Sequence, residues 1–364
     1  MTQLTARWAN ADERARWDEL VTANPDGGDF LQSQTVAEAK IPHGMEPRHI
    51  VFEADGERVS VAIFHERRIP VLGKLWWGSR APAVTTVAEL EQHVDALRRF
   101  IRMNVTGLFT VTFEPPVLSS DDVERQLRES PSLTAPDILR REGMQANLNT
   151  VLVDLHADDE ELMGQFNRTT RKMIRRGERT GINVVEYPPT QETFDRMHEL
   201  MRLVGGGKGG LLLRPKSYME ALWRGFTSKG QGRFTAVEVD GEPAMLTFTI
   251  AYGDRAIYKD TGSRRELSQP GMAQLINLEA MRSSRERGAK IYDMFGVAPE
   301  SATSDDDHVL FTSGRLKLGF GERVTHIGAF DLVVRKAQHR LWNRIGERAY
   351  AKLYRTRTGD FSIY

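Results

Sequence analysis

The stretch that decides the fold runs from Arg233 to Gly296 and reads RFTAVEVDGEPAMLTFTIAYGDRAIYKDTGSRRELSQPGMAQLINLEAMRSSRERGAKIYDMFG. Its alternating and β-rich apolar runs predict three strands. Helical spacing then predicts a helix from Gly271, and the last apolar run, at Ile291, predicts a fourth strand. The same order of elements recurs from Arg48 to Glu114. This recurrence indicates a structural duplication.

Three strands, a helix and a further strand resemble the core of the acyl-CoA N-acyltransferase (GNAT) fold. We therefore expect a mixed α/β protein, of the α+β kind, with two tandem GNAT-like domains. The first domain is expected over residues 1–150, with the C-terminal segment 325–364 packing back on it. The second is expected over residues 151–324, after a seam near Leu148 to Leu155.

Periodicity predicts the remaining elements in the same way. The other strands are predicted at Arg48 to Glu53, Val59 to His65, Leu108 to Glu114, Thr150 to Leu155 and Ile182 to Tyr187. The other helices are predicted at Thr86 to Met103, Asp158 to Arg179, Thr190 to Val204, Pro215 to Ser228 and Arg335 to Leu353.

Composition excludes several classes of protein. The chain has 364 residues, 50 Lys plus Arg against 50 Asp plus Glu, and no cysteine. A zero formal net charge removes the overall basic field of a dedicated nucleic-acid binder, so an anionic partner would need a local patch. Without cysteine there are no disulfides, thiolate metal sites or cysteine nucleophiles.

The sequence also bears on localisation. The start, MTQLTARWANADERARW, is polar and charged where a signal peptide needs an apolar core. No apolar run approaches the ~18 residues of a spanning helix. We expect a cytoplasmic protein, with a peripheral contact at the inner face of the membrane as a further option.

The clearest local pattern is a cationic stripe within the predicted helix Asp158 to Arg179. At 100° per residue, one arc collects Arg168, Arg171, Lys172, Arg175, Arg176 and Arg179, and the opposite side is apolar. Such a face either is simply solvated or binds a polyanion such as RNA or a nucleotide.

Two glycine-containing segments resemble phosphate sites. Gly205 to Gly210 fails the Walker pattern because no Ser or Thr follows Lys208, so a loop between helices is expected there. Ser268 to Ala273 leads into a helix start, but Ser268 stands where an acetyl-CoA signature needs Gln or Arg. A plain helix N-terminus is therefore favoured over an acetyl-CoA site.

Hydrolytic and metal-dependent chemistry find little support. The nine histidines lack the i, i+4 pairing of a zinc helix, and no Gly-x-Ser-x-Gly elbow occurs. Asp305 to Asp307 are expected to form an exposed polar loop, and no metal site is assigned.

Several segments, in their order and spacing, closely resemble the Fem family, whose members use aminoacyl-tRNA to lengthen the peptide stem of peptidoglycan precursors. The segments are Phe30 to Gln34 with Val36 and Lys40, Trp77 to Pro82, Asn167 to Ile182, Tyr258 to Ser263, Ile291 to Gly296 and Gly314 to Gly321. Leu316 departs from the family's usual Phe before the lysine. Pro215 to Arg233 leaves no room for the helical arm of some members, so the chain resembles the armless type.

The resemblance implies the site. Lys40, Arg214, Tyr218 and Tyr258 match positions that bind the precursor, which is linked to UDP or to a lipid. Lys317 matches a lysine that stabilises charge during acyl transfer, and Glu114 matches a position near the acceptor amine. The cations Arg168, Arg171, Lys172, Arg175 and Arg176 are expected to bind tRNA. Aminoacyl-tRNA is the co-substrate, and no other cofactor is expected.

Three other functions stay open at the level of sequence. A Fem-like enzyme can act on an antibiotic or peptide metabolite, and an acyl-CoA N-acyltransferase can share the fold. A noncatalytic module for RNA or an anionic membrane would use the cationic stripe and the basic C-terminal helix. The transferred amino acid and the oligomeric state are not encoded in any motif that we can identify.

Overall fold

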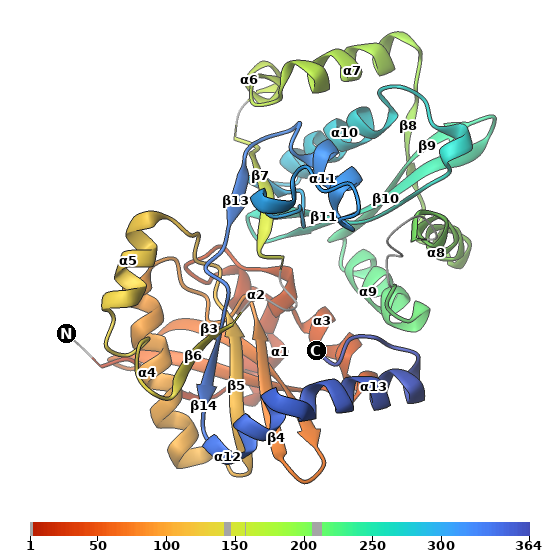
Figure 1. Ribbon diagram of the computed structural model, residues 1–364. Helices are drawn as coiled ribbons and strands as arrows, with labels where there is room; N and C mark the ends of the chain where they lie inside the picture. Colours follow the sequence, from red (N-terminus) through yellow and green to blue (C-terminus); the bar gives the residue numbers. More distant parts are fainter. Residues whose placement is uncertain (1–2, 142–146, 157, 206–212) are drawn as a thin grey trace. The chain divides into compact units, whose positions relative to one another are not determined.

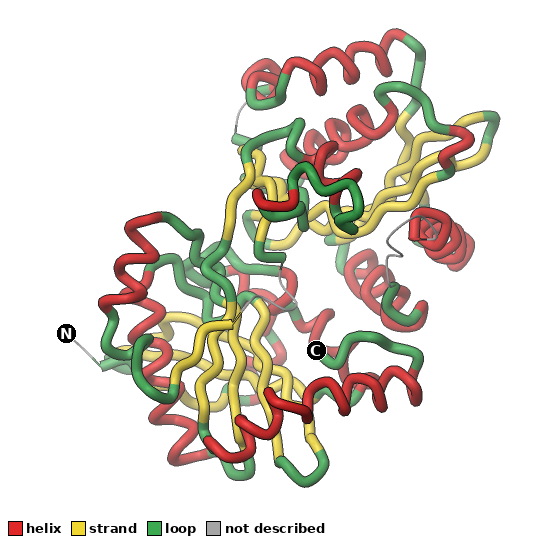
Figure 2. Tube along the Cα trace, in the orientation of Figure 1, coloured by secondary structure: helices red, strands yellow, loops and turns green. Residues whose placement is uncertain are grey.

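The computed structural model describes residues 3–141, 147–156, 158–205 and 213–364 (Figure 1). It divides into two compact units, the first made of Met1–Leu148 and Thr325–Tyr364 and the second of Asn149–Val324. Each unit carries its own seven-stranded sheet, and helices flank each sheet (Figure 2). The predicted Gly205 to Gly210 loop lies almost wholly outside the described residues.

The sheet of the first unit has the order β1-β2-β3-β4-β5-β14-β6. Its strands are β1 (Thr5–Trp8), β2 (Glu46–Ala54), β3 (Glu57–Ile69), β4 (Gly73–Ser79), β5 (Leu108–Glu114), β6 (Ile138–Arg141) and β14 (Ala329–Val333). Among the described strands of this sheet, only β4 and β5 pair in parallel, because a helix crosses over between them. The helices of this unit are α1 (Ala11–Ala15), α2 (Trp17–Thr22), α3 (Gln34–Lys40), α4 (Val87–Asn104), α5 (Asp121–Glu129), α12 (Lys336–Leu341) and α13 (Glu347–Thr358).

The crossover helix α4 shows how sequence builds this unit. Thr86 and Glu89 form a reciprocal capping box at its start. Leu90, Val94 and Leu97 then recur at helical spacing and are buried in the core against the sheet.

The sheet of the second unit has the order β13-β7-β12-β11-β10-β9-β8. Its strands are β7 (Asn149–Asp154), β8 (Val184–Tyr187), β9 (Gly232–Val239), β10 (Glu242–Tyr252), β11 (Arg255–Ser263), β12 (Ile291–Asp293) and β13 (Arg323–Thr325). Here β11 and β12 pair in parallel, joined through α10. The helices are α6 (Asp159–Gly164), α7 (Arg168–Arg179), α8 (Gln191–Gly205), α9 (Lys216–Ser228), α10 (Met272–Glu286) and α11 (Phe311–Lys317).

The predicted fold class is confirmed by the repeated topology. The order β2-β3-β4-α4-β5 of the first unit recurs as β9-β10-β11-α10-β12 in the second. In both units one antiparallel strand from outside the repeat extends the sheet. That strand is β14 on β5 and β7 on β12. Thus the C-terminal segment contributes a strand to the first unit.

Three predicted elements differ from the structure. The predicted helix Asp158 to Arg179 is two helices, because the Asn167 side chain accepts from the Thr170 amide and starts α7 anew. The predicted C-terminal helix contains a π-helical segment, Trp342–Gly346, between α12 and α13. The segment Trp77 to Pro82, which resembles an aromatic, glycine and proline turn of the Fem family, is a turn only from Arg80, since Trp77 to Ser79 belong to strand β4.

Among the residues that the structure describes, no helix has both the length and the apolar character needed to cross a bilayer.

Candidate functional site

Lys317 is the last residue of α11, and its side chain is held by backbone carbonyls of a neighbouring turn. Its Nζ donates to the oxygen of Gly296 at 2.9 Å and lies 3.4 Å from that of Phe295. The same nitrogen lies 5.6 Å from the centre of the Tyr258 ring. Lys317 thus ends a helix, and backbone carbonyls accept the hydrogen bonds of its ammonium.

The turn after β12 has an unusual backbone that presents these carbonyls. Phe295 has a φ of 59°, in the left-handed region that residues other than glycine rarely adopt. The Asp293 carboxylate supports the turn, since it accepts from the Phe295 amide at 2.8 Å and from the Thr150 hydroxyl. Backbone strain of this kind clusters at functional sites.

Burial controls the charge of Lys317. The residue is only 8% exposed, and this burial lowers the pKa of its ammonium to about 8, while the nearby Asp293 charge acts in the opposite direction. The group is therefore mostly protonated at neutral pH. Because its unfolded pKa of 10.5 is higher, the unfolded chain binds more protons between pH 8 and 10.5, and the free energy of unfolding should rise with pH in that window.

Tyr258 and Asn277 add neutral polar groups beside the lysine. Both are buried, and burial raises the pKa of the Tyr258 phenol, so it stays protonated. The phenol lies near Thr261 and Asn277, but among the described residues neither the Tyr258 hydroxyl nor the Asn277 Oδ1 has a hydrogen bond of good geometry. Asn277 was not predicted, although a lone amide within an apolar helix face was the available signal.

Arg214 and Tyr218 lie together, as their four-residue spacing predicts. The Arg214 guanidinium stacks 4.2 Å above the centre of the Tyr218 ring. Pro215 caps the start of α9, and Trp223 ties this helix to the sheet by donating to Asp260 at 2.9 Å. The pair is thus placed on a helix that is anchored to β11.

Helix α7 presents the cationic stripe, and its first turn lies against the turn that follows Lys317. The Asn167 amide donates to the Gly319 carbonyl at 2.9 Å, so α7 starts against the turn that follows Lys317. Four predicted tRNA-binding cations are exposed and, within the described ranges, form no ion pair with a carboxylate: Arg168, Lys172, Arg175 and Arg176. Arg171 differs, because it is half-buried and donates to the Phe166 carbonyl at 2.5 Å.

Lys40 and Glu114 belong to the first unit. Lys40 ends α3 and is 1% exposed. Burial of the His65 ring, and secondarily the Lys40 charge, keeps the pKa of that ring well below its usual value. Glu114 ends β5, opposite Ser79, and is also buried. The structure therefore brings Lys317 to Tyr258 and Arg214 to Tyr218, while a common substrate for all six residues stays a prediction.

The acidic run Asp305 to Asp307 is exposed, and its carboxylate oxygens lie within 4.8 Å of one another. Exposed acidic runs are common surface features, and we assign no metal to this one.

Comparison with known proteins adds to this geometry. A family model described as an acetyltransferase (GNAT) domain matches residues 164–307. The chain is 23% identical over 239 residues to the Lipid II:glycine glycyltransferase of Staphylococcus haemolyticus, covering 63% of this chain and 54% of that protein. The Staphylococcus aureus (strain COL) protein of the same name is 25% identical over 234 residues, covering 61% and 53%.

A solved structure shares the fold over nearly the whole chain. The crystal structure of FemX superposes with a TM-score of 0.77 at 19% identity, covering 94% of this chain and 99% of that one. The chain thus has the fold of FemX and is similar in sequence to these glycyltransferases. The chain spans about half the length of the curated relatives it matches. In it, α9 passes through three residues into β9, so no helical arm stands between them.

In the second unit, the start of α10 crosses α7 at close range. Gly271 precedes α10 with a φ of +96°, and a Cβ there would lie 2.3 Å from the Met173 carbonyl oxygen of α7. We expect Gly271→Ala to lower the free energy of unfolding by about 2 kcal/mol or more, from backbone strain plus steric overlap.

Gly181→Ala is the matched control, because Gly181 also has a positive φ, +71°, but no atom lies within 4 Å of its added Cβ. Urea unfolding should show a loss of about 1 kcal/mol for the control. Equal losses in the two variants would mean that the crossing contributes nothing beyond strain.

Proposed function

We propose that the chain is an aminoacyltransferase that moves an amino acid from aminoacyl-tRNA onto an amine of a peptidoglycan precursor stem peptide. The precursor is linked to UDP or to a lipid. The observation that carries the proposal is the ammonium of Lys317, buried, held by the carbonyls of Phe295 and Gly296, and adjoining the start of a cationic helix.

In this reaction an acceptor amine attacks the ester carbonyl of aminoacyl-tRNA. The C–N bond forms, the bond to the ribose oxygen breaks, the amine loses a proton and the ribose hydroxyl gains one. The tetrahedral intermediate carries a negative oxygen, which a preorganised cation stabilises more than it stabilises the ester. Lys317 is proposed to supply that cation, because its carbonyl partners hold the ammonium in place without neutralising it by a carboxylate.

The remaining residues are proposed to position the two substrates. Arg214 and Lys40 would bind the diphosphate of the precursor, since Arg grips two oxygens at once and Lys supplies a point charge. Tyr218 and Tyr258 would donate neutral hydrogen bonds, and Glu114 would lie near the acceptor amine. On α7, Arg168, Arg171, Lys172, Arg175 and Arg176 would bind phosphates of the tRNA.

The acyl-CoA alternative is weakened by the helix crossing. In a helix N-terminus that binds a pyrophosphate, the backbone amides must be open to the ligand. Here the backbone of α7 packs against the start of α10, within 2.3 Å of the position of a Gly271 Cβ. A Fem-like enzyme acting on an antibiotic or peptide metabolite would use the same chemistry and differs only in the acceptor.

Pairwise transfer assays test the proposal. Radiolabelled aminoacyl-tRNA and acetyl-CoA are each offered with a UDP-linked or lipid-linked precursor. We expect label to move only from aminoacyl-tRNA, onto the stem peptide. Movement from acetyl-CoA alone would overturn the proposal, and movement from tRNA onto a peptide metabolite but never onto a precursor would select the antibiotic alternative.

The pH dependence of turnover tests the role of Lys317. Because the ammonium is the active form and its pKa is about 8, kcat should fall as pH rises through about 8. Lys317→Arg should retain part of the activity and lose this descending limb, since a guanidinium stays charged over the whole range. A kcat that rises through pH 8 would instead indicate that the neutral amine acts as a base.

A further inference from the structure

Several aliphatic side chains at one end of the first unit are exposed and are not part of its hydrophobic core. β3 ends and β4 begins there, and the parallel β5 begins and the antiparallel β14 ends there too. Contacts join these parts, since the Lys74 amide donates to Gly107 at 2.8 Å and the Val334 amide to Phe109 at 3.0 Å. Figure 1 shows the β3–β4 hairpin and α12 at this end, the lower end of the unit as drawn.

The hairpin tip carries an unusual residue. Val71 is completely exposed, at 101%, and has a φ of 68°. A β-branched residue in the left-handed region is an outlier, and Gly, Asn or Asp would suit such a tip better. Neither solubility nor backbone conformation favours valine here. On the adjoining last turn of α4, Met103 is 77% exposed.

The C-terminal helical segment continues this surface. Trp342, Gly346, Tyr350 and Tyr354 recur every four residues on its inward side, where Gly346 approaches Leu72 of the hairpin. The residue before each forms an exposed apolar row: Leu341, Ile345, Ala349 and Leu353. One position earlier in each turn, an exposed cationic row follows the apolar one: Arg340, Arg344, Arg348 and Lys352. From Lys336 to Thr358 there are seven Lys or Arg and one acidic residue, Glu347, which pairs with Arg141.

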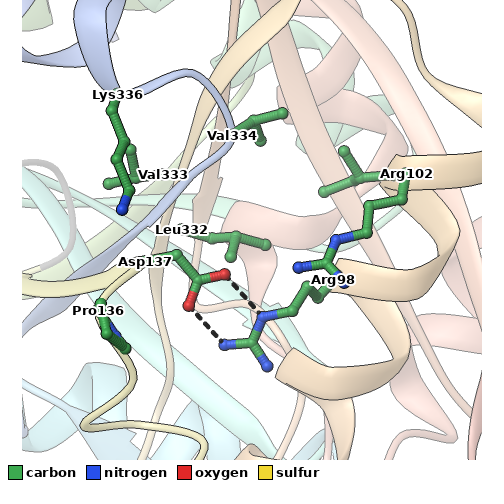
Figure 3. Close-up of a pocket in the computed structure, with 9 residues that line it drawn as sticks. Arg98, Arg102, Pro136, Asp137, Leu332, Val333, Val334 and Lys336 are labelled. Atoms are coloured by element: carbon green, nitrogen blue, oxygen red, sulfur yellow. Dashed lines mark hydrogen bonds and ion pairs between the residues drawn. The ribbon is translucent and has the colours of Figure 1, made fainter.

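A pocket of about 510 Å³ opens at the same end (Figure 3). Ile101 and Leu332 are among its apolar lining residues. Arg102 and Lys336 stand on opposite sides of it. Arg98 is already neutralised, because it binds both oxygens of Asp137, at 2.9 and 3.2 Å. The two other cations are exposed and have no acidic partner in the part of the chain that the structure describes.

We propose that this end of the first unit docks on an anionic lipid bilayer. Val71, Met103, Leu341 and Ile345 would enter the interface, the cationic row would lie at the phosphates, and the pocket would receive an anionic headgroup between Arg102 and Lys336. Aliphatic side chains beside cations are typical of membrane-surface segments, whereas single-stranded RNA is bound by aromatic stacking and duplex RNA by polar contacts. The inference goes beyond the aminoacyl transfer and does not depend on it.

Vesicle sedimentation with the full chain tests the proposal. We expect binding to phosphatidylcholine vesicles containing phosphatidylglycerol, weaker binding to phosphatidylcholine alone, and a fall in affinity with salt. Arg340→Glu with Arg344→Glu should weaken binding roughly 10-fold or more. Val71→Asp should also weaken it, and Arg102→Gln with Lys336→Gln should reduce the preference for the anionic vesicles.

Matched controls lie at the other end of β3. Val59 is 38% exposed, so Val59→Asp makes the same change as Val71→Asp away from the proposed surface. Arg58 there and Arg128 of α5 are also exposed, so Arg58→Glu with Arg128→Glu matches the double charge reversal. Equal binding to both kinds of vesicle, or equal losses in control and test variants, would overturn the proposal. Loss of tRNA binding with unchanged vesicle binding in the Arg340 and Arg344 variant would also overturn it, in favour of an RNA surface. Turnover with a soluble precursor should be unchanged by Val71→Asp. This assay therefore reports on the aminoacyl transfer independently of vesicle binding, and a failure of one proposal can be distinguished from a failure of the other.

Discussion

Lys317→Met should lower kcat for transfer from aminoacyl-tRNA by ~10² to 10³, or about 3 to 4 kcal/mol of transition-state stabilisation. The variant keeps the length of the side chain and removes only the charge that would face the tetrahedral oxyanion. Steady-state kinetics with both substrates saturating measure the effect. Precursor binding should be nearly unchanged, because Lys317 is not proposed to bind the ground state.

The same variant should not unfold the protein. Burial lowers the Lys317 pKa to about 8, which means that the surroundings disfavour its charge, so the methionine variant should melt at the same temperature or higher. Lys290→Met is the matched control in the same unit, since Lys290 is half-exposed and pairs with Asp254 at 2.7 Å. Near-normal turnover of Lys317→Met would remove this residue from the mechanism, and a collapse of its melting temperature would assign it a structural role.

Reversing two exposed cations of α7, Arg175→Glu with Arg176→Glu, should raise the KM for aminoacyl-tRNA by roughly 10² near physiological salt. The slope of log KM against log salt should shrink by about 2, because two phosphate contacts are lost. The KM for the precursor should stay the same. Arg171 is left intact in this design, because its hydrogen bond to Phe166 shapes the turn between α6 and α7.

The control for this pair carries the same change of charge elsewhere. Arg58→Glu with Arg128→Glu alters two exposed arginines of the first unit. If the control raises the KM for aminoacyl-tRNA as much as the α7 variant does, the effect is one of net charge. If neither variant changes it, the stripe is only a solvated helix face.

Local periodicity was enough to predict most of the repeated core of this protein. The strands and the helix between Arg233 and Gly296 follow from side-chain spacing, because each spacing buries one face of one kind of element. Strand β4 was harder to recognise from sequence. Both Trp76 and Trp77 are buried, on opposite faces of the sheet, so the alternation that marks a strand is absent.

Side-chain spacing did not predict where α7 begins. The apolar and cationic positions from Leu162 to Arg179 fit one continuous helix, yet Asn167 caps a new one. Asn is suited to such a cap, but the decisive contact is long-range, since the Asn167 amide donates to Gly319, which is distant in sequence. Because the break between α6 and α7 depends on a carbonyl from a distant segment, the local spacing of side chains does not predict it.

For the site, the sequence by itself determined which residue types were available: a lysine before Leu318, an arginine four residues before Tyr218, and a run of cations after Asn167. Only the tertiary structure decided that Lys317 points at the carbonyls of Phe295 and Gly296, and that Asn277 and Tyr258 share its surroundings. The physical reason is that helix and strand spacing reflect which face of an element is buried. The environment that holds and tunes a buried charge is instead assembled from segments far apart along the chain, whose meeting depends on the whole core.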